Sequence, residues 1–214
     1  MYRLLQIDEL QRSFHHFLTP EDDCFYFMEY TSNTDFRYSP SNDLISNFKK
    51  SPEHRDHPQW AHKSRAIWKV GNILAQTLLP AAGVPDVVIV PIPTSKRRDH
   101  PLYDDRMLQV LSSLQQRDQD VDVREILTIR HNMEATHISS GKRSPMKIGQ
   151  NLLLNKNLCV TTKNKFLLVD DMITSGAHFI ACKSKLLEQF PEAIIKGLFI
   201  ARRTFKADVK DMNI

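Results

Sequence analysis

Two adjacent carboxylates, Asp170 and Asp171, are the residues of this chain with the most specific chemistry. They follow the apolar run 166–169, whose length and composition predict a buried strand. Carboxylates at a strand end suit sugar hydroxyls or a hydrated metal ion. The alternative that these residues leave open is an ordinary acidic strand end followed by a Thr/Ser helix cap.

A short turn links the acidic pair to the next predicted helix. Its residues are Thr174, Ser175, Gly176, Ala177 and His178. Backbone N–H groups at a helix amino end lack intrahelical acceptors, so they favour an anion. One ligand that carries both hydroxyls and a phosphate, such as a phosphorylated ribose, would suit the whole segment 166–178.

A second predicted strand, 87–90, also ends in residues that suit an anion. The polar and basic residues after it are Thr94, Ser95, Lys96, Arg97 and Arg98. Their positive charge suits an anionic group, and the alternative is a solvated turn with a basic run.

The polar segment 130–150 contains Gly141, Pro145 and Gly149, which predict a long loop. Long loops in compact domains often act as lids over a site. Lys142 and Arg143 are two adjacent cations within it. A polar surface loop without a role is the alternative.

The order of predicted elements from residue 64 onward defines the expected fold. It reads helix 64–79, strand 87–90, helix from 103, strand 123–129, loop, strand 166–169, helix to 190 and strand 194–201. This alternation predicts an α/β fold, with a mostly parallel, Rossmann-like sheet flanked by helices. Ligands of such sheets bind beyond the carboxyl ends of the strands.

The first part of the chain lacks this alternation. Apolar residues at helical spacing predict a helix over 1–20, and 21–63 are irregular in composition. We therefore expect an N-terminal helical or irregular extension, or hood, over 1–63 and an α/β core over 64–214.

Bulk properties narrow the class of protein. The 214 residues carry a formal net charge of +4, which suits a polyanionic small molecule and leaves weak nucleic-acid affinity open. No apolar run approaches the roughly 18–20 residues of a membrane span, so we expect no membrane partner. The few, widely spaced cysteines Cys24, Cys159 and Cys182 favour a reducing compartment, and we expect a cytoplasmic protein.

The segment 166–178 resembles the phosphoribosyl-pyrophosphate (PRPP) signature of type I phosphoribosyltransferases. Four apolar residues, two acids, two apolar residues and Thr-Ser-Gly-Ala match in order, and His178 stands where Thr or Ser is usual. The strand end Pro91-Ile92-Pro93 and the later Arg106, Arg130 and Asn151 are similar to the competence-type (ComF-like) branch. The cysteine zinc ribbon of that branch is missing here.

This resemblance implies an activity and a cofactor. The implied enzyme is a pentosyltransferase of nucleotide metabolism. It uses Mg²⁺ and PRPP, moves the 5-phosphoribosyl group to a nitrogenous, nucleobase-like acceptor and releases pyrophosphate. The alternative is a non-catalytic regulatory protein that binds PRPP or a nucleotide. Members of the family often pair, so a homodimer is one expectation.

The resemblance also implies a role for each matched residue. Asp170 and Asp171 would hold the ribose hydroxyls, directly or through magnesium-bound water, and act with Arg143 in catalysis. Met172 and Ile173 complete the signature, and 174–178 would hold the 5′-phosphate. The pyrophosphate would bind Thr94, Ser95, Lys96, Arg97 and Lys142.

Overall fold

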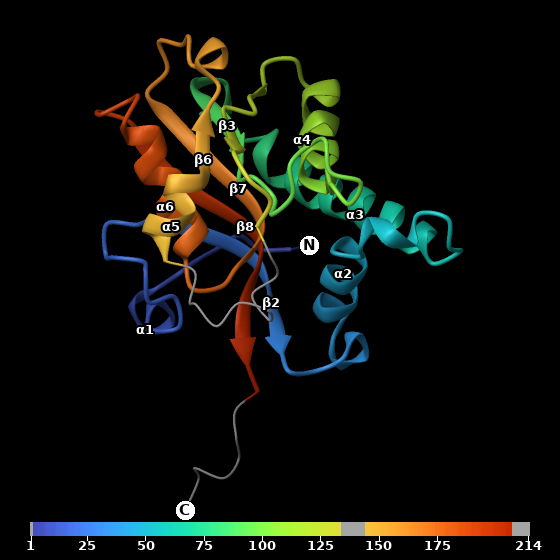
Figure 1. The fold of residues 1–214 in the computed structure, drawn as a ribbon. Coiled ribbons are helices and arrows are strands. Elements are labelled where there is room, and N and C mark those ends of the chain that lie inside the picture. The colour runs from blue at the N-terminus through green and yellow to red at the C-terminus, as the bar shows by residue number, and fades with distance from the viewer. Residues whose placement is uncertain (1, 134–143, 207–214) are drawn as a thin grey trace, which may run out of the picture.

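A six-stranded sheet forms the centre of the protein, in the order β1-β2-β8-β7-β3-β4 (Figure 1). The computed structural model describes residues 2–133 and 144–206. The strands are β1 (Leu5–Gln6), β2 (Cys24–Ser32), β8 (Ile194–Phe205), β7 (Lys165–Ile173), β3 (Val87–Pro91) and β4 (Asp122–Val123). Only β1 runs antiparallel to its neighbour. The predicted α/β class with a mostly parallel sheet is confirmed.

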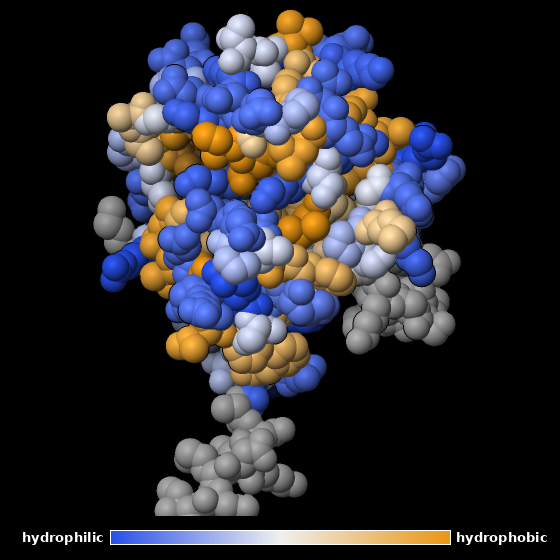
Figure 2. All heavy atoms as spheres, turned by 90° about the vertical axis from the view of Figure 1, so that its left-hand side faces the viewer, coloured by the Kyte–Doolittle hydropathy of each residue, from blue (hydrophilic) through white to orange (hydrophobic). Residues whose placement is uncertain are grey.

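Helices cover both faces of this sheet (Figure 1). One layer holds α2 (Pro40–Phe48), α3 (Trp60–Leu78) and α4 (Arg106–Arg117), and the other holds α1 (Glu9–Arg12), α5 (Pro145–Asn151) and α6 (Ala177–Leu187). Side chains alternate along β7: Phe166 and Leu168 pack in the cluster with α6, and Val169 packs in the cluster with α3 and α4. Figure 2 faces the α6 layer, whose surface mixes hydrophobic and hydrophilic side chains.

Smaller elements complete the described part of the chain. β5 (Leu127–Ile129) and β6 (Leu152–Leu154) pair antiparallel, and short 3-10 helices form η1 (Phe36–Tyr38), η2 (Pro52–His54), η3 (Val84–Asp86) and η4 (Lys156–Leu158). Among residues 2–133 and 144–206, no helix has the length and apolarity needed to cross a membrane.

The predicted helix over 1–20 is wrong for the residues that the structure describes. Only α1 is helical there; its amino end is capped by Asp8, whose side chain accepts the Gln11 N–H at 2.8 Å. The run 24–32, read as irregular, instead forms β2 and pairs with β8 along its length. The sheet therefore contains strands from both sides of the boundary expected at residue 63: β1 and β2 precede it, and β3, β4, β7 and β8 follow it.

The packing of α6 on β8 depends on a glycine. A Cβ added at Gly197 would lie 2.9 Å from ring carbons of Phe179 and Phe199. Both rings are buried, so they cannot swing into solvent. We expect Gly197→Ala to lower the free energy of unfolding by about 1–3 kcal/mol in urea denaturation, through overpacking.

Gly149→Ala is the matched control for this change. Nothing lies within 4 Å of the Cβ it would add, and it stands inside α5. The control should be neutral or stabilise by up to about 1 kcal/mol through helix propensity. Equal unfolding energies for the two variants would contradict the packing argument.

Candidate functional site

The ends of β3 and β7 bring the acidic and basic segments together. Pro91 lies opposite Val169 in the parallel ladder, and the Ile92 N–H donates to the Val169 carbonyl at 2.9 Å. The loop after β3 and the acidic pair of β7 therefore start side by side, at the carboxyl edge of the sheet. This is the edge where open α/β sheets bind ligands.

The two acids have different surroundings. Asp171 is 3% exposed, and its Oδ2 accepts from Arg106 Nε at 2.9 Å and also from Arg106 Nη2. Its Oδ1 accepts from Lys49 Nζ at 3.1 Å. Although burial opposes ionisation, these two cations hold the pKa of Asp171 well below its usual range. Asp171 is thus a buried, fully ionised partner of two cations.

A chain of buried charges extends from Asp171 into the α2–α4 layer. Arg106 Nη1 lies 2.5 Å from Asp104 Oδ2, which also accepts from Lys63 Nζ at 2.7 Å. Lys63 donates further to the carbonyls of Phe48 and Lys50, at 2.9 and 2.8 Å. Burial lowers the pKa of Lys63, and the Asp104 carboxylate opposes this shift. The five-residue network Lys49–Asp171–Arg106–Asp104–Lys63 fixes α2, α3 and α4 against β7.

Asp170 lies outside this network. It is half-buried, and its Oδ1 accepts the Asp171 N–H at 2.7 Å. Within the described residues no Lys or Arg forms an ion pair with it. Burial and the neighbouring Asp171 charge raise the pKa of Asp170 to about 7, against the opposing charges of Lys49 and Arg106. Asp170 is therefore the carboxylate that a bound cation or hydroxyl would stabilise.

The turn between β7 and α6 is held by the amino-terminal segment 15–18. The His15 ring Nδ1–H donates to the Thr174 carbonyl, and the Phe17 N–H donates to the Ser175 carbonyl at 3.1 Å. Gly176 has φ +85°, and a Cβ there would lie 2.9 Å from Leu18 Cδ2. The carbonyl groups of Thr174 and Ser175 are therefore occupied, and the N–H groups of the turn are the groups that could bind an anion.

The remaining residues of the predicted PRPP segment have different surroundings. Ile173 is 2% exposed and packs in the cluster with α6, while Met172 packs against the opposite cluster. These two side chains support the strand end. His178 is half-buried in the first turn of α6.

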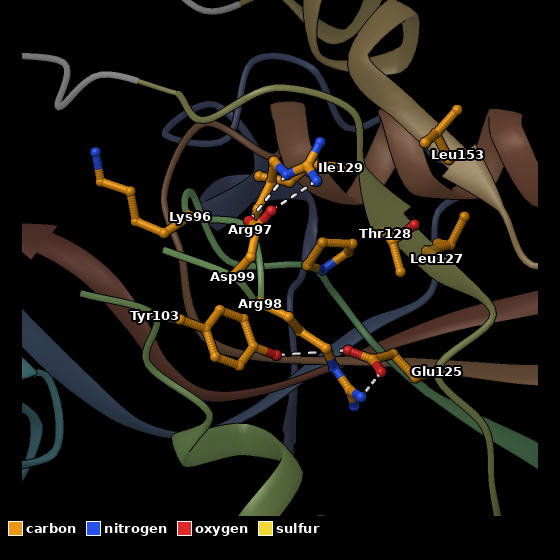
Figure 3. Close-up of a pocket in the computed structure, with 11 residues that line it drawn as sticks. Lys96, Arg97, Arg98, Asp99, Tyr103, Glu125, Leu127, Thr128, Ile129 and Leu153 are labelled. Carbon is orange, nitrogen blue, oxygen red and sulfur yellow. Dashed lines mark hydrogen bonds and ion pairs between the residues drawn. The ribbon is translucent and has the colours of Figure 1, made fainter. Parts of the chain in front are cut away.

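The basic loop is partly neutralised by its own contacts (Figure 3). Arg97 pairs with Asp99 at 2.8 Å and donates to the Arg130 carbonyl at 2.9 Å, while Arg98 pairs with Glu125. Lys96 extends away from these pairs in Figure 3 and forms no ion pair with any residue that the structure describes. Among the three loop cations Lys96, Arg97 and Arg98, Lys96 is thus the one whose charge no described carboxylate neutralises.

A cavity of about 340 Å³ lies between this loop and β5. Its wall includes Lys96, Tyr103, Glu125, Thr128 and Leu153. Thr94 and Ser95 come directly before Lys96 in the loop. The Thr94 hydroxyl donates to the Lys96 carbonyl at 3.1 Å, and the Ser95 carbonyl accepts the Met133 N–H at 2.8 Å.

The predicted lid residues Lys142 and Arg143 lie outside the described residues. Asn151 joins the described residues at the two ends of the polar segment 130–150. Its side chain accepts the His131 N–H at 2.9 Å and donates to the His131 carbonyl at 2.8 Å. The Arg130 N–H donates to the Asn151 carbonyl at 2.8 Å. Arg130 and Asn151, far apart in sequence, thus meet where the segment begins and ends.

The donor set fits a magnesium ion that arrives with its ligand. Among the described residues there is no group of three or more His, Cys, Asp or Glu that would hold a metal by themselves. Mg²⁺ commonly binds through one or two carboxylates, waters and substrate phosphates. Asp170, which has a raised pKa and forms no ion pair with a described residue, matches that pattern.

Lys49, Lys63 and Asp104 were not predicted from the sequence as functional residues. One signal was available: Lys63 stands at the start of the stripe Lys63, Ala66, Val70, Leu74 on the apolar face of α3, where a charge requires a buried partner. Nothing local in the sequence pairs Lys49 with Asp171, because 122 residues separate them.

Comparison with known proteins adds no assignment. No protein-family model matches this chain, and no curated protein matches it significantly.

The different surroundings of the two acids predict opposite effects of neutralising them. Asp170→Asn should raise the free energy of unfolding by about 1–3 kcal/mol near pH 8, because it removes a buried charge beside Asp171. The folded pKa of Asp170 is raised, so the wild type loses stability as pH rises from about 4 to about 7. The gain of the variant should grow over this window, as measured by urea unfolding.

Asp171→Asn is the comparison variant. It leaves Arg106 and Lys49 without their shared carboxylate, so it should destabilise by about 3 kcal/mol near neutral pH. The folded pKa of Asp171 is lowered, so its contribution is present above about pH 4 and is lost in stronger acid. Destabilisation of both variants to the same extent near pH 8 would contradict the assignment.

Proposed function

We propose that this chain is a type I phosphoribosyltransferase that uses Mg-PRPP and a nitrogenous, nucleobase-like acceptor. The observation that carries the proposal is the adjacency of two loops at one sheet edge. One offers a carboxylate and a glycine turn at a helix amino end, and the other offers the unpaired Lys96. A ribose that carries a 5′-phosphate and a 1-pyrophosphate would bind both loops at once.

The proposed reaction breaks the bond between C1 of the ribose and the pyrophosphate oxygen. A ring nitrogen of the acceptor forms the new bond to C1, and its proton passes to the departing pyrophosphate or to solvent. Mg²⁺ bound to the pyrophosphate would neutralise charge on the leaving group. The protein contributes mainly positioning and electrostatics.

The residues of the two loops would have different roles in this reaction. Asp170 accepts a hydrogen bond from a ribose hydroxyl, residues 174–178 bind the 5′-phosphate, and Lys96 binds the pyrophosphate. Asp171 orients Asp170 through its N–H, 2.7 Å from Asp170 Oδ1. A direct ribose contact by Asp171, as the resemblance implies, requires that Lys49 or Arg106 first release it.

Arg143 and Lys142 keep their proposed role as contacts to the leaving group. Cytoplasmic location is also part of the proposal, and the three free, buried cysteines suit a reducing compartment.

A non-catalytic PRPP-binding or nucleotide-binding protein is the second candidate. The observation that favours it is that several polar groups at the carboxyl edge of the sheet already have protein partners. Asp171 is held by two cations, and His15 and Phe17 occupy the carbonyls of the turn. A binder needs only the ligand contacts, whereas an enzyme also needs access for an acceptor.

The binding test separates the two ends of PRPP. Calorimetry should give an affinity for Mg-PRPP that falls roughly 30-fold or more in Asp170→Asn, the loss expected for a charge-assisted hydrogen bond of about 2 kcal/mol. Asp120→Asn, an exposed turn residue, should change nothing. Lys96→Gln should weaken PRPP and leave ribose 5-phosphate unaffected, because only PRPP carries the pyrophosphate.

The activity test uses the same protein with Mg-PRPP and a panel of nucleobases, and pyrophosphate release is the readout. Release with one base supports the transferase. Binding of PRPP without release from any base supports the second candidate. If neither PRPP nor ribose 5-phosphate binds, both candidates are wrong.

A further inference from the structure

A buried arginine with unmet hydrogen-bonding groups lies near the ends of β2 and β8. Arg202 is 6% exposed, and its Nη2 donates to Glu29 Oε1 at 2.5 Å. Its Nε and Nη1 are buried and have no hydrogen-bond partner in the part of the chain that the structure describes. The guanidinium also lies 5.4 Å from the centre of the Tyr26 ring. Buried donors of a charged group without acceptors are costly, so they call for a functional explanation.

Arg202 lines a cavity of about 370 Å³. Glu29 lies opposite Arg202 in the ladder, and Thr31 lies opposite Thr204. Because side chains alternate along a strand, all four reach the same face of the sheet and form a polar wall. The two threonine hydroxyls lie 3.4 Å apart.

Aromatic side chains stand at the mouth of this cavity. Phe14, Tyr38 and Phe205 line it and are about half exposed, at 54%, 50% and 50%. Exposed rings of this kind stack on planar ligands. Lys206 adds a second cation to the lining. The volume is at the lower end of the range for small-molecule sites.

We propose that this cavity binds a planar aromatic carboxylate, with Arg202 as the anchoring cation. The carboxylate accepts hydrogen bonds from the Arg202 N–H groups that have no partner among the described residues, and the ring stacks against the aromatic side chains of the lining. A singly charged carboxylate suits this wall better than a phosphate dianion, because the Glu29 carboxylate repels a second negative charge. The inference does not depend on the phosphoribosyl proposal, since none of its residues belongs to the two loops at β3 and β7.

Titration calorimetry or ligand-observed NMR with benzoate tests this site in the full chain. Benzoate should bind the wild type, whereas benzamide, which lacks the charge, and acetate, which lacks the ring, should bind at least about tenfold more weakly. Arg202→Gln should weaken benzoate by about tenfold or more, the loss expected for one charge-assisted hydrogen bond. Arg117→Gln, on the outer surface of α4, should leave the affinity unchanged.

A second pair of variants keeps the test decisive if Arg202→Gln fails to fold. Phe14→Ala removes an exposed ring at the mouth and should weaken benzoate several-fold, while Trp68→Ala, an exposed ring on α3, should not. Asp170→Asn should bind benzoate like the wild type, which separates this site from the proposed PRPP site. The proposal is overturned if benzoate does not bind, if Phe14→Ala binds it unchanged, or if inorganic phosphate binds in its place with higher affinity.

Discussion

The burial of Asp171 at the carboxyl edge of the sheet is the constraint on which the site depends. A buried carboxylate is tolerated only with cationic partners and hydrogen bonds, and here Arg106 and Lys49 supply them. Those partners come from the start of α4 and the end of α2. Lys63 and Asp104 extend the pairing to α3. One buried charge thus determines how three helices meet one strand end.

The same constraint gives Asp170 its character. Burial of Asp170 and the retained charge of Asp171 both oppose its ionisation, so the pKa of Asp170 rises. Asp171 therefore stays ionised, whereas Asp170 changes its protonation state near neutral pH. For this reason we call Asp170 the adjustable carboxylate. An adjustable carboxylate at a sheet edge, beside a turn that offers N–H groups, suits a ligand that brings its own hydroxyls and cation. This reasoning joins the fold to the proposed donor substrate and does not specify the acceptor.

The sequence predicted the parts of this arrangement that depend on local pattern. The apolar run 166–169 and the turn at Gly176 gave the strand, the loop and the start of α6. Parallel packing then placed Pro91 beside Val169. The role of β2 was missed because its apolar and aromatic residues lie in a part of the chain without regular alternation. Its place in the sheet depends on pairing with β8, which is distant in the sequence. The contacts of Lys49 and Arg202 were also missed, since they depend on partners more than 100 residues away.

The two proposed ligand sites lie near the carboxyl ends of different strands, β3 and β7 for the first and β2 and β8 for the second. The α2–α4 layer fixes Asp171, and the opposite layer holds His15 against the turn and encloses Arg202. In the first site, Asp170 lies beside Asp171, which is already paired with two cations. In the second, Arg202 is paired with Glu29 through one nitrogen, and its other two nitrogens have no partner among the described residues.

The central claim is that Asp170 is the adjustable carboxylate that binds the ribose of Mg-PRPP. The most direct measurement is an NMR titration of the Asp170 carboxyl carbon, with and without Mg-PRPP. The account predicts a pKa of about 7 in the free protein, and a carboxylate that stays ionised to lower pH once Mg-PRPP is bound. An ordinary Asp pKa in the free protein, with no response to Mg-PRPP, would contradict it.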